Sequence, residues 1–117
     1  MEQLKPNKKI DDLLETVLGL KNIIEARAFF RDLCTMKEIG EMADRWEMAK
    51  MIDQGVPYRE IAKKLKVSTT TVSRVAYWLS SGMDGYRLAL EQRLKNTNHH
   101  RDSSSSEKGL RFHNIAG

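Results

Sequence analysis

The densest run of residues that could contact a polyanion lies between Tyr58 and Arg74, where hydroxyl and basic side chains are interspersed with small apolar ones. Lysine and arginine neutralise phosphate charge, and short hydroxyls can hydrogen-bond phosphate oxygens or base edges. A threonine methyl can also contact the methyl group of thymine. The side chains expected to contact double-stranded DNA are Arg59, Lys63, Lys66, Ser68, Thr69, Thr70, Thr71, Ser73 and Arg74.

Two short helices joined by a tight turn would present these side chains together. Apolar residues follow the helical period within about residues 58–65 and again within about residues 69–80. This is the helix-turn-helix pattern, in which the second helix enters the major groove of DNA. The apolar positions that would hold the two helices together are Ile61, Ala62, Leu65, Val67, Val72, Val75, Ala76 and Leu79.

The turn and the start of the second helix carry their own signals. Ser68 is suited to cap that helix, because its hydroxyl can accept a hydrogen bond from a backbone N–H two or three residues on. Lys66 stands where such turns often have glycine, and a left-handed conformation costs a non-glycine residue roughly 1–2 kcal/mol. Either the chain tolerates this cost or the turn has another shape. Ser and Thr before an apolar run can also serve only as a cap and a turn, and this alternative stays open.

Charge is unevenly distributed along the chain. The 117 residues carry a net charge of +4. Residues 58–74 contain five bases and one acid, whereas residues 11–57 contain ten acids and six bases. This asymmetry suits a DNA-binding protein whose body faces away from the phosphates, although an ordinary solvated surface is also compatible with it.

The sequence offers little for other kinds of chemistry. Cys34 is the single cysteine, which excludes an internal disulfide and indicates a reducing, cytoplasmic setting; its apolar neighbours predict a buried side chain. The three histidines lie in a polar tail, where no fixed set of ligands is expected to hold a metal. No apolar run approaches the ~20 residues of a membrane helix. We therefore expect no enzyme, no catalytic residue, no metal, no cofactor and no membrane segment. The histidines are His99, His100 and His113.

The rest of the pattern predicts an all-α protein of about six helices. Thr35 and Glu38 predict a capping box at the start of a helix, and Gly55 marks that helix's end. Gly40 could divide that helix into a short and a long one. The four helices outside the helix-turn-helix are expected at about residues 11–20, 22–34, 36–54 and 84–94. The domain boundaries that follow are a polar lead-in over residues 1–9, one helical domain over 10–95 and a disordered polar tail over 96–117.

The N-terminal half carries more apolar residues than a monomer of this size needs. Around residues 22–34 they occupy nearly every side of the predicted helix, which indicates burial on more than one side. DNA-binding proteins with two-fold symmetry also use paired half-sites. The sequence therefore predicts a homodimer.

The order of these elements resembles the Trp repressor-like proteins. The segments FFRDLCTMKEI, WEMAKMIDQG, TVSRV and GMDGYRLALE are most similar to the YerC/YecD-type branch of that family. The resemblance extends from about Ile10 to Leu94 and excludes the tail. It implies an intertwined two-fold dimer and DNA binding by the helix that begins at Thr69.

The resemblance also raises the question of a ligand. In Trp repressors two arginines help to hold the tryptophan corepressor, and Arg45 and Arg74 occupy the matching positions here. Val75 replaces a glycine of the repressor and Trp78 replaces a serine, so less space remains for a free amino acid. Trp78 could fill the pocket in part, or belong to the core or the dimer interface.

Together these features predict a sequence-specific DNA-binding transcriptional regulator, with repression as the expected outcome and no control by tryptophan. Two alternatives stay open: a helical dimeric module that binds another protein, and a regulator gated by a different small ligand.

Overall fold

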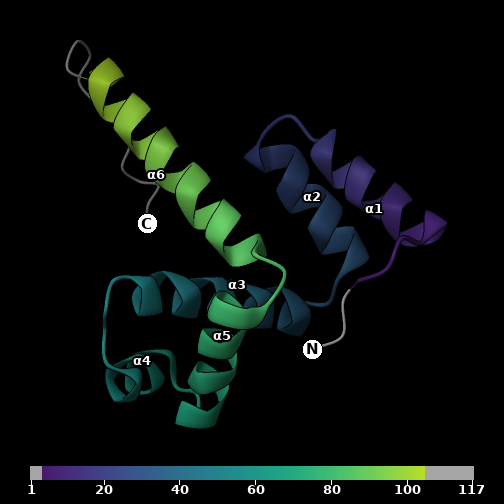
Figure 1. The fold of residues 1–117 in the computed structure, drawn as a ribbon. Helices are drawn as coiled ribbons and strands as arrows, with labels where there is room; N and C mark the ends of the chain where they lie inside the picture. The colour runs from purple at the N-terminus through teal and green to yellow at the C-terminus, as the bar shows by residue number, and fades with distance from the viewer. Residues whose placement is uncertain (1–3, 105–117) are drawn as a thin grey trace.

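In the computed structural model, the chain is described for residues 4–104, with side chains through residue 96. This part folds into six α-helices and contains no strand, so the prediction of an all-α architecture is confirmed (Figure 1). None of its helices is both long and apolar enough to cross a membrane. The helices are α1 (Lys8–Leu18), α2 (Ile23–Leu33), α3 (Met36–Asp53), α4 (Tyr58–Leu65), α5 (Thr69–Ser81) and α6 (Gly85–Ser104).

Side-chain caps explain where the first three helices begin. Asn7 and Asn22 each accept a hydrogen bond from the backbone three residues on, at 3.0 and 2.9 Å. The capping box predicted before α3 is present: the Glu38 backbone N–H donates to the Thr35 hydroxyl at 3.0 Å, and the Thr35 N–H donates to the Glu38 carboxylate at 2.8 Å. Each cap satisfies donors that the first helical turn leaves unpaired.

The helix α3 is continuous, so the suggested division at Gly40 is wrong. An interior glycine costs a helix only about 1 kcal/mol relative to alanine, which the capping box and the packed C-terminal half can offset. The end of α3 was predicted correctly. Gly55 adopts φ +84°, and Val56 N–H donates back to the Met51 carbonyl at 3.0 Å. This left-handed residue lets the chain reverse into α4.

The hydrophobic core lies where α3, α4 and α5 meet. Each of these helices contributes side chains that are almost fully enclosed, and α4 and α5 pack against each other and against α3. Complete burial of an aliphatic side chain contributes about 1.5–3 kcal/mol. Because the cluster draws side chains from α3, α4 and α5, a change in the angle between α4 and α5 would expose some of them. Its members are Met48, Ala49, Met51, Ile61, Ala62, Val72 and Val75.

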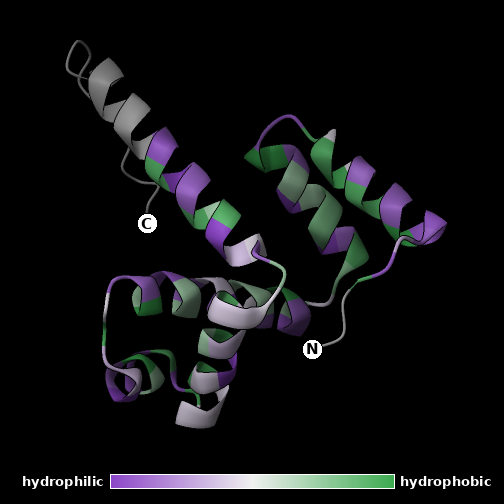
Figure 2. Ribbon diagram, in the orientation of Figure 1, coloured by the Kyte–Doolittle hydropathy of each residue, from purple (hydrophilic) through white to green (hydrophobic). Residues whose placement is uncertain are grey.

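The first two helices stand apart from this core (Figure 1). Neither α1 nor α2 contains a buried residue within the described chain, although α2 contacts α3. Hydrophobic residues recur along both helices (Figure 2), and Leu18 is 83% exposed. Cys34, at the end of α2, is only partly covered. The prediction that Cys34 is buried is therefore wrong for the described part of the chain, where Cys34 borders an open cavity beside the start of α3.

The helix α6 is longer than expected. It continues past the predicted end at Leu94 to Ser104, because no glycine or proline interrupts the chain after Gly85 in this stretch. Its first turn is attached to α3 through stacking of Tyr86 on Trp46, with ring centroids 6.4 Å apart. The proposed boundary of the disordered tail at residue 96 thus falls inside a helix. Residues 105–117 lie outside the described part, and their disorder stays a prediction.

Candidate nucleic-acid interface

The turn between α4 and α5 adopts the left-handed shape without a glycine. Lys66 has φ 59° and ψ 46°, so the chain tolerates the unfavourable conformation at this position. The following residue, Val67, donates its N–H to the Ala62 carbonyl at 3.0 Å, and its side chain packs against the core. The turn is therefore fixed at both of its residues, and the Lys66 side chain is exposed to solvent.

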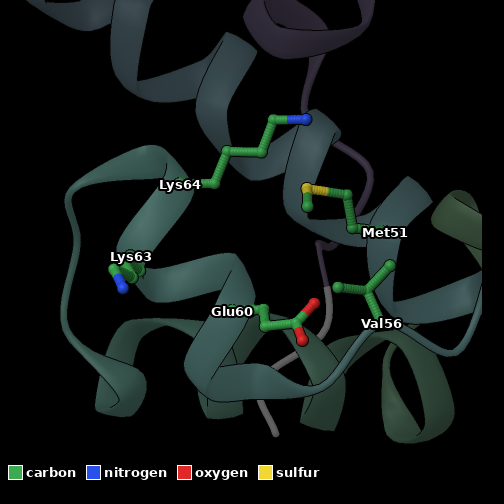
Figure 3. Close-up of a pocket in the computed structure, with 5 residues that line it drawn as sticks. All are labelled: Met51, Val56, Glu60, Lys63 and Lys64. Carbon is green, nitrogen blue, oxygen red and sulfur yellow. The ribbon is translucent and has the colours of Figure 1, made fainter.

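The basic side chains of α4 are exposed, and Lys63 and Lys64 lie in its last turn. Figure 3 shows Lys63 and Lys64 leaving the helix in different directions. Both line a shallow cavity of about 420 Å³ whose apolar part is formed by Met51 and Val56, with Glu60 at its edge. Arg59 is exposed as well. Within residues 4–96 no salt bridge neutralises these bases, which keeps their charge available to an external anion.

The start of α5 is held by the predicted cap. The Ser68 hydroxyl accepts a hydrogen bond from the Thr71 N–H at 3.1 Å and lies 3.0 Å from the Thr71 hydroxyl. Thr71 is accordingly half-buried, whereas Thr69 and Thr70 are exposed. Of the three consecutive threonines, two thus present free side chains and the third is engaged in the cap.

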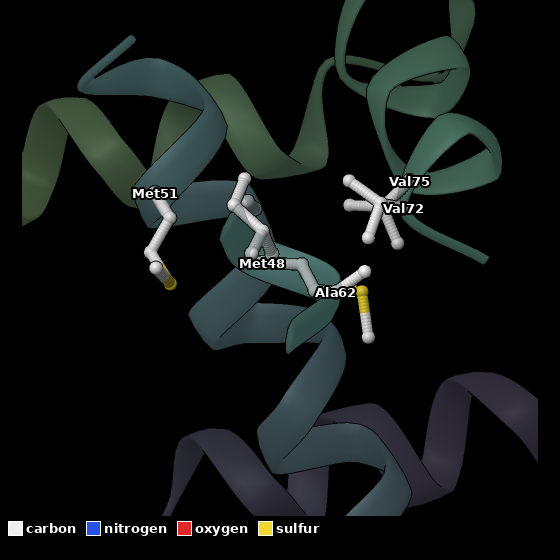
Figure 4. Packing of buried hydrophobic residues seen from close by; sticks show 7 residues of the cluster. Met48, Met51, Ala62, Val72 and Val75 are labelled. Atoms are coloured by element: carbon white, nitrogen blue, oxygen red, sulfur yellow. The ribbon is translucent and has the colours of Figure 1, made fainter. Parts of the chain in front are cut away.

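One side of α5 is buried and the opposite side is open. Val72 and Val75 point toward Met48 and Ala62 in the core (Figure 4), and both are at most 1% exposed. The helical period turns Thr70, Ser73 and Arg74 away from this stripe, and all three are exposed. The structure therefore places Thr70, Ser73 and Arg74 on one exposed face of α5, whereas the predicted Thr71 is held in the cap. The predicted set omits Tyr77, which shares that free face and is 53% exposed.

Within the described part of the chain, the residues predicted for a ligand pocket lie in different surroundings. Arg45 lines a cavity of about 320 Å³ with Cys34, Glu38 and other residues between α2 and α3. Trp78 lines a different cavity of about 360 Å³, next to Gly82, Met83, Gly85 and Tyr86. Val75 is part of the core, and Arg74 is on the exposed face of α5.

Tyr86, which lines the same cavity as Trp78, has a shifted pKa. Burial raises the pKa of the Tyr86 phenol above its usual 10.0, and the nearby Arg45 guanidinium partly opposes this. Among the residues with described side chains, no group of three or more His, Cys, Asp or Glu is arranged to hold a metal ion. The three histidines noted in the sequence lie beyond that part of the chain.

In this all-α domain, α4 and α5 are joined by a tight turn and packed on a common core, and one face of α5 is exposed. These features define a helix-turn-helix domain. Residues 8–94 match the family model of the Trp repressor protein, which covers the six helices up to the middle of α6. The chain therefore belongs to the Trp repressor protein family, a family of DNA-binding regulators.

Individual relatives agree with this assignment. The chain is 41% identical to the Bacillus subtilis protein YerC over 101 residues, which is 86% of this chain and 92% of YerC. A crystal structure of a TrpR-like protein from Eubacterium eligens superposes with a TM-score of 0.71 at 40% identity, covering 74% of this chain and 89% of that one. A candidate Trp repressor from Staphylococcus aureus gives the same TM-score at 39% identity, covering 75% and 88%.

Proposed function

We propose that this chain is a sequence-specific DNA-binding regulator that represses transcription by inserting the N-terminal part of α5 into the major groove. The observation that carries the proposal is the free face of α5: its apolar stripe is buried in the core, and the N-terminal part of the exposed side carries hydroxyls and a base. A surface for a protein partner would instead be expected to expose apolar residues at Thr69, Thr70 and Ser73.

Each predicted residue has a role in this proposal. Thr69, Thr70 and Ser73 face the base edges, because they lie on the exposed first turns of the inserted helix. Ser68 and Thr71 fix the helix start and leave its backbone N–H groups directed at a phosphate. The basic residues bind phosphates and contribute affinity that is independent of sequence; they are Arg59, Lys63, Lys66 and Arg74.

We further propose that the regulator is a homodimer formed through its N-terminal helices. The proposal is supported by the exposure of Leu18, Ile23 and Ile24 on α1 and α2, which are 83%, 68% and 70% exposed in the single chain. A second copy would cover these side chains and would set two α5 helices at the spacing of two half-sites. Sedimentation equilibrium of the full chain should give twice its 13.5 kDa mass; a monomer at micromolar concentration would contradict this part.

We propose that DNA binding does not require tryptophan. The core position of Val75 supports this, as does the separation of Arg45 and Trp78 into two cavities that share no residue. In this arrangement the bulky side chains at positions 75 and 78 fix the position of α5 without a corepressor.

The test is selection of preferred DNA from a random pool by the purified full chain at physiological salt, with and without tryptophan. We expect a palindromic motif, with half-sites about one helical turn apart, in both samples. Enrichment only with tryptophan would contradict ligand independence. No enrichment in either sample would contradict the DNA-binding proposal and favour a protein-interaction module.

A further inference from the structure

The exposed face of α5 extends beyond the residues at its start. Tyr77 follows Thr70 by seven residues, which is close to two full turns of 3.6 residues, so the two side chains lie on the same side of the helix. Ser81 continues that line one turn later. The stripe formed by Val72, Val75 and Leu79 is buried on the other side. Tyr77 therefore belongs to the same open face that carries Thr70.

The neighbouring aromatic residue has a different environment. Trp78, one position further along α5, lines the cavity formed with Met83 and Tyr86 at the junction with α6. Tyr77 is not among the residues that line this cavity and is 53% exposed. The two consecutive aromatic side chains thus lie on different sides of α5, and only Tyr77 lies on the face proposed to contact DNA.

The height of Tyr77 along the helix determines what it can contact. Seven residues advance the helix by about 10 Å, and the major groove is about 12 Å wide. When Thr70 reaches the base edges, Tyr77 stands at the level of the sugar–phosphate backbone that borders the groove. A phenol hydroxyl is a good donor to phosphate oxygens, and its ring is rigid enough to hold that position.

We propose that Tyr77 is a further DNA-contacting residue, whose hydroxyl donates a hydrogen bond to a phosphate at the wall of the major groove that α5 enters. This inference rests on the proposed function. Tyr77 is a neutral donor, so it strengthens binding without releasing a counterion, unlike Arg74 one turn earlier.

The test compares full-length variants on the DNA selected by the unaltered protein. Tyr77→Phe removes one hydroxyl from an exposed side chain and should weaken binding about tenfold, the effect of losing a hydrogen bond to a charged group. The dependence of binding on salt should keep its slope. Arg74→Ala should lower that slope by about one. Tyr86→Phe makes the same chemical change at the base of α6, away from the exposed face of α5, and should bind normally.

A second measurement locates the contact. Replacing single phosphates of the half-site with neutral methylphosphonates should identify one position that weakens the unaltered protein and has little further effect on Tyr77→Phe. Circular dichroism should show equal helicity in both proteins, which excludes unfolding as the cause.

The outcomes separate the inference from the function on which it rests. If the unaltered protein selects a motif and Tyr77→Phe binds it equally well, the role of Tyr77 is refuted while the DNA-binding proposal stands. If Tyr77→Phe lowers the salt slope, the contact is not a neutral hydrogen bond and the inference fails. If the unaltered protein selects no DNA, both proposals fail.

Discussion

Replacing Lys66 with glycine should stabilise the fold and weaken DNA binding at the same time. Lys66 is the left-handed residue of the turn between α4 and α5, with φ 59° and ψ 46°. This conformation costs a residue with a Cβ roughly 1–2 kcal/mol, whereas glycine adopts it without strain. Glycine also makes the unfolded chain more flexible, which lowers the free energy of unfolding by about 0.5–1 kcal/mol.

With the middle of each range, the net gain expected for Lys66→Gly is about 0.75 kcal/mol in the free energy of unfolding. For a domain of this size that corresponds to a rise in Tm of about 2–8 °C. Thermal unfolding followed by circular dichroism measures this rise, with protein concentrations matched because the Tm of a dimer depends on concentration.

Lys66→Ala is the matched control, because it removes the same charge and keeps the Cβ that causes the strain. Lys66→Gly should be the more stable of the two variants. On DNA the two should behave alike, with weaker binding to all sequences and a salt slope lowered by about one. If Lys66→Gly is no more stable than Lys66→Ala, the strain argument is wrong; if sequence preference changes, Lys66 contacts bases and not a phosphate.

Three further predictions follow from the same structure. Thr70→Glu should abolish binding to the selected DNA by repulsion of the phosphates while leaving helicity unchanged, because Thr70 is exposed; retained binding would remove Thr70 from the interface. Ile61→Ala should cost about 2–5 kcal/mol in urea unfolding, since Ile61 is fully buried between the helices; a loss below about 1 kcal/mol would mean that this core does not hold the helix pair. Burial raises the pKa of Tyr86 above 10.0, with Arg45 opposing, so the folded state favours the neutral phenol. The stability this provides is complete below pH 10.0 and is lost as the pH rises through the folded-state pKa; in alkaline unfolding Tyr86→Phe should lose less stability than the unaltered protein, and equal losses would refute this.

Features set by neighbouring residues could be predicted from the sequence. The capping box of Thr35 and Glu38 and the cap at Ser68 join residues three positions apart, so their residue types suffice to predict them. The bounds of α4 and the start of α5 likewise follow from a short apolar period between a proline and a capping residue. These interactions form within one helical turn and do not depend on distant parts of the chain.

Features that depend on tertiary packing were harder to predict from the sequence. Gly40 does not interrupt α3, because the cost of one glycine is small against the packing of the whole helix. Cys34 has apolar neighbours in sequence but is only partly covered, because the packing of α2 on α3 leaves an open cavity beside it. The positions matched to a ligand pocket are divided between two cavities, the core and the outer face of α5.

The sequence by itself determined that a basic, hydroxyl-rich helix pair exists and where it begins and ends, because helical period and caps are local. Only the tertiary structure decided which side of α5 is covered. Packing against α3 and α4 buries Val72 and Val75, the junction with α6 forms the cavity lined by Trp78, and Tyr77 remains exposed beside Thr70. That division depends on contacts between residues far apart in the chain.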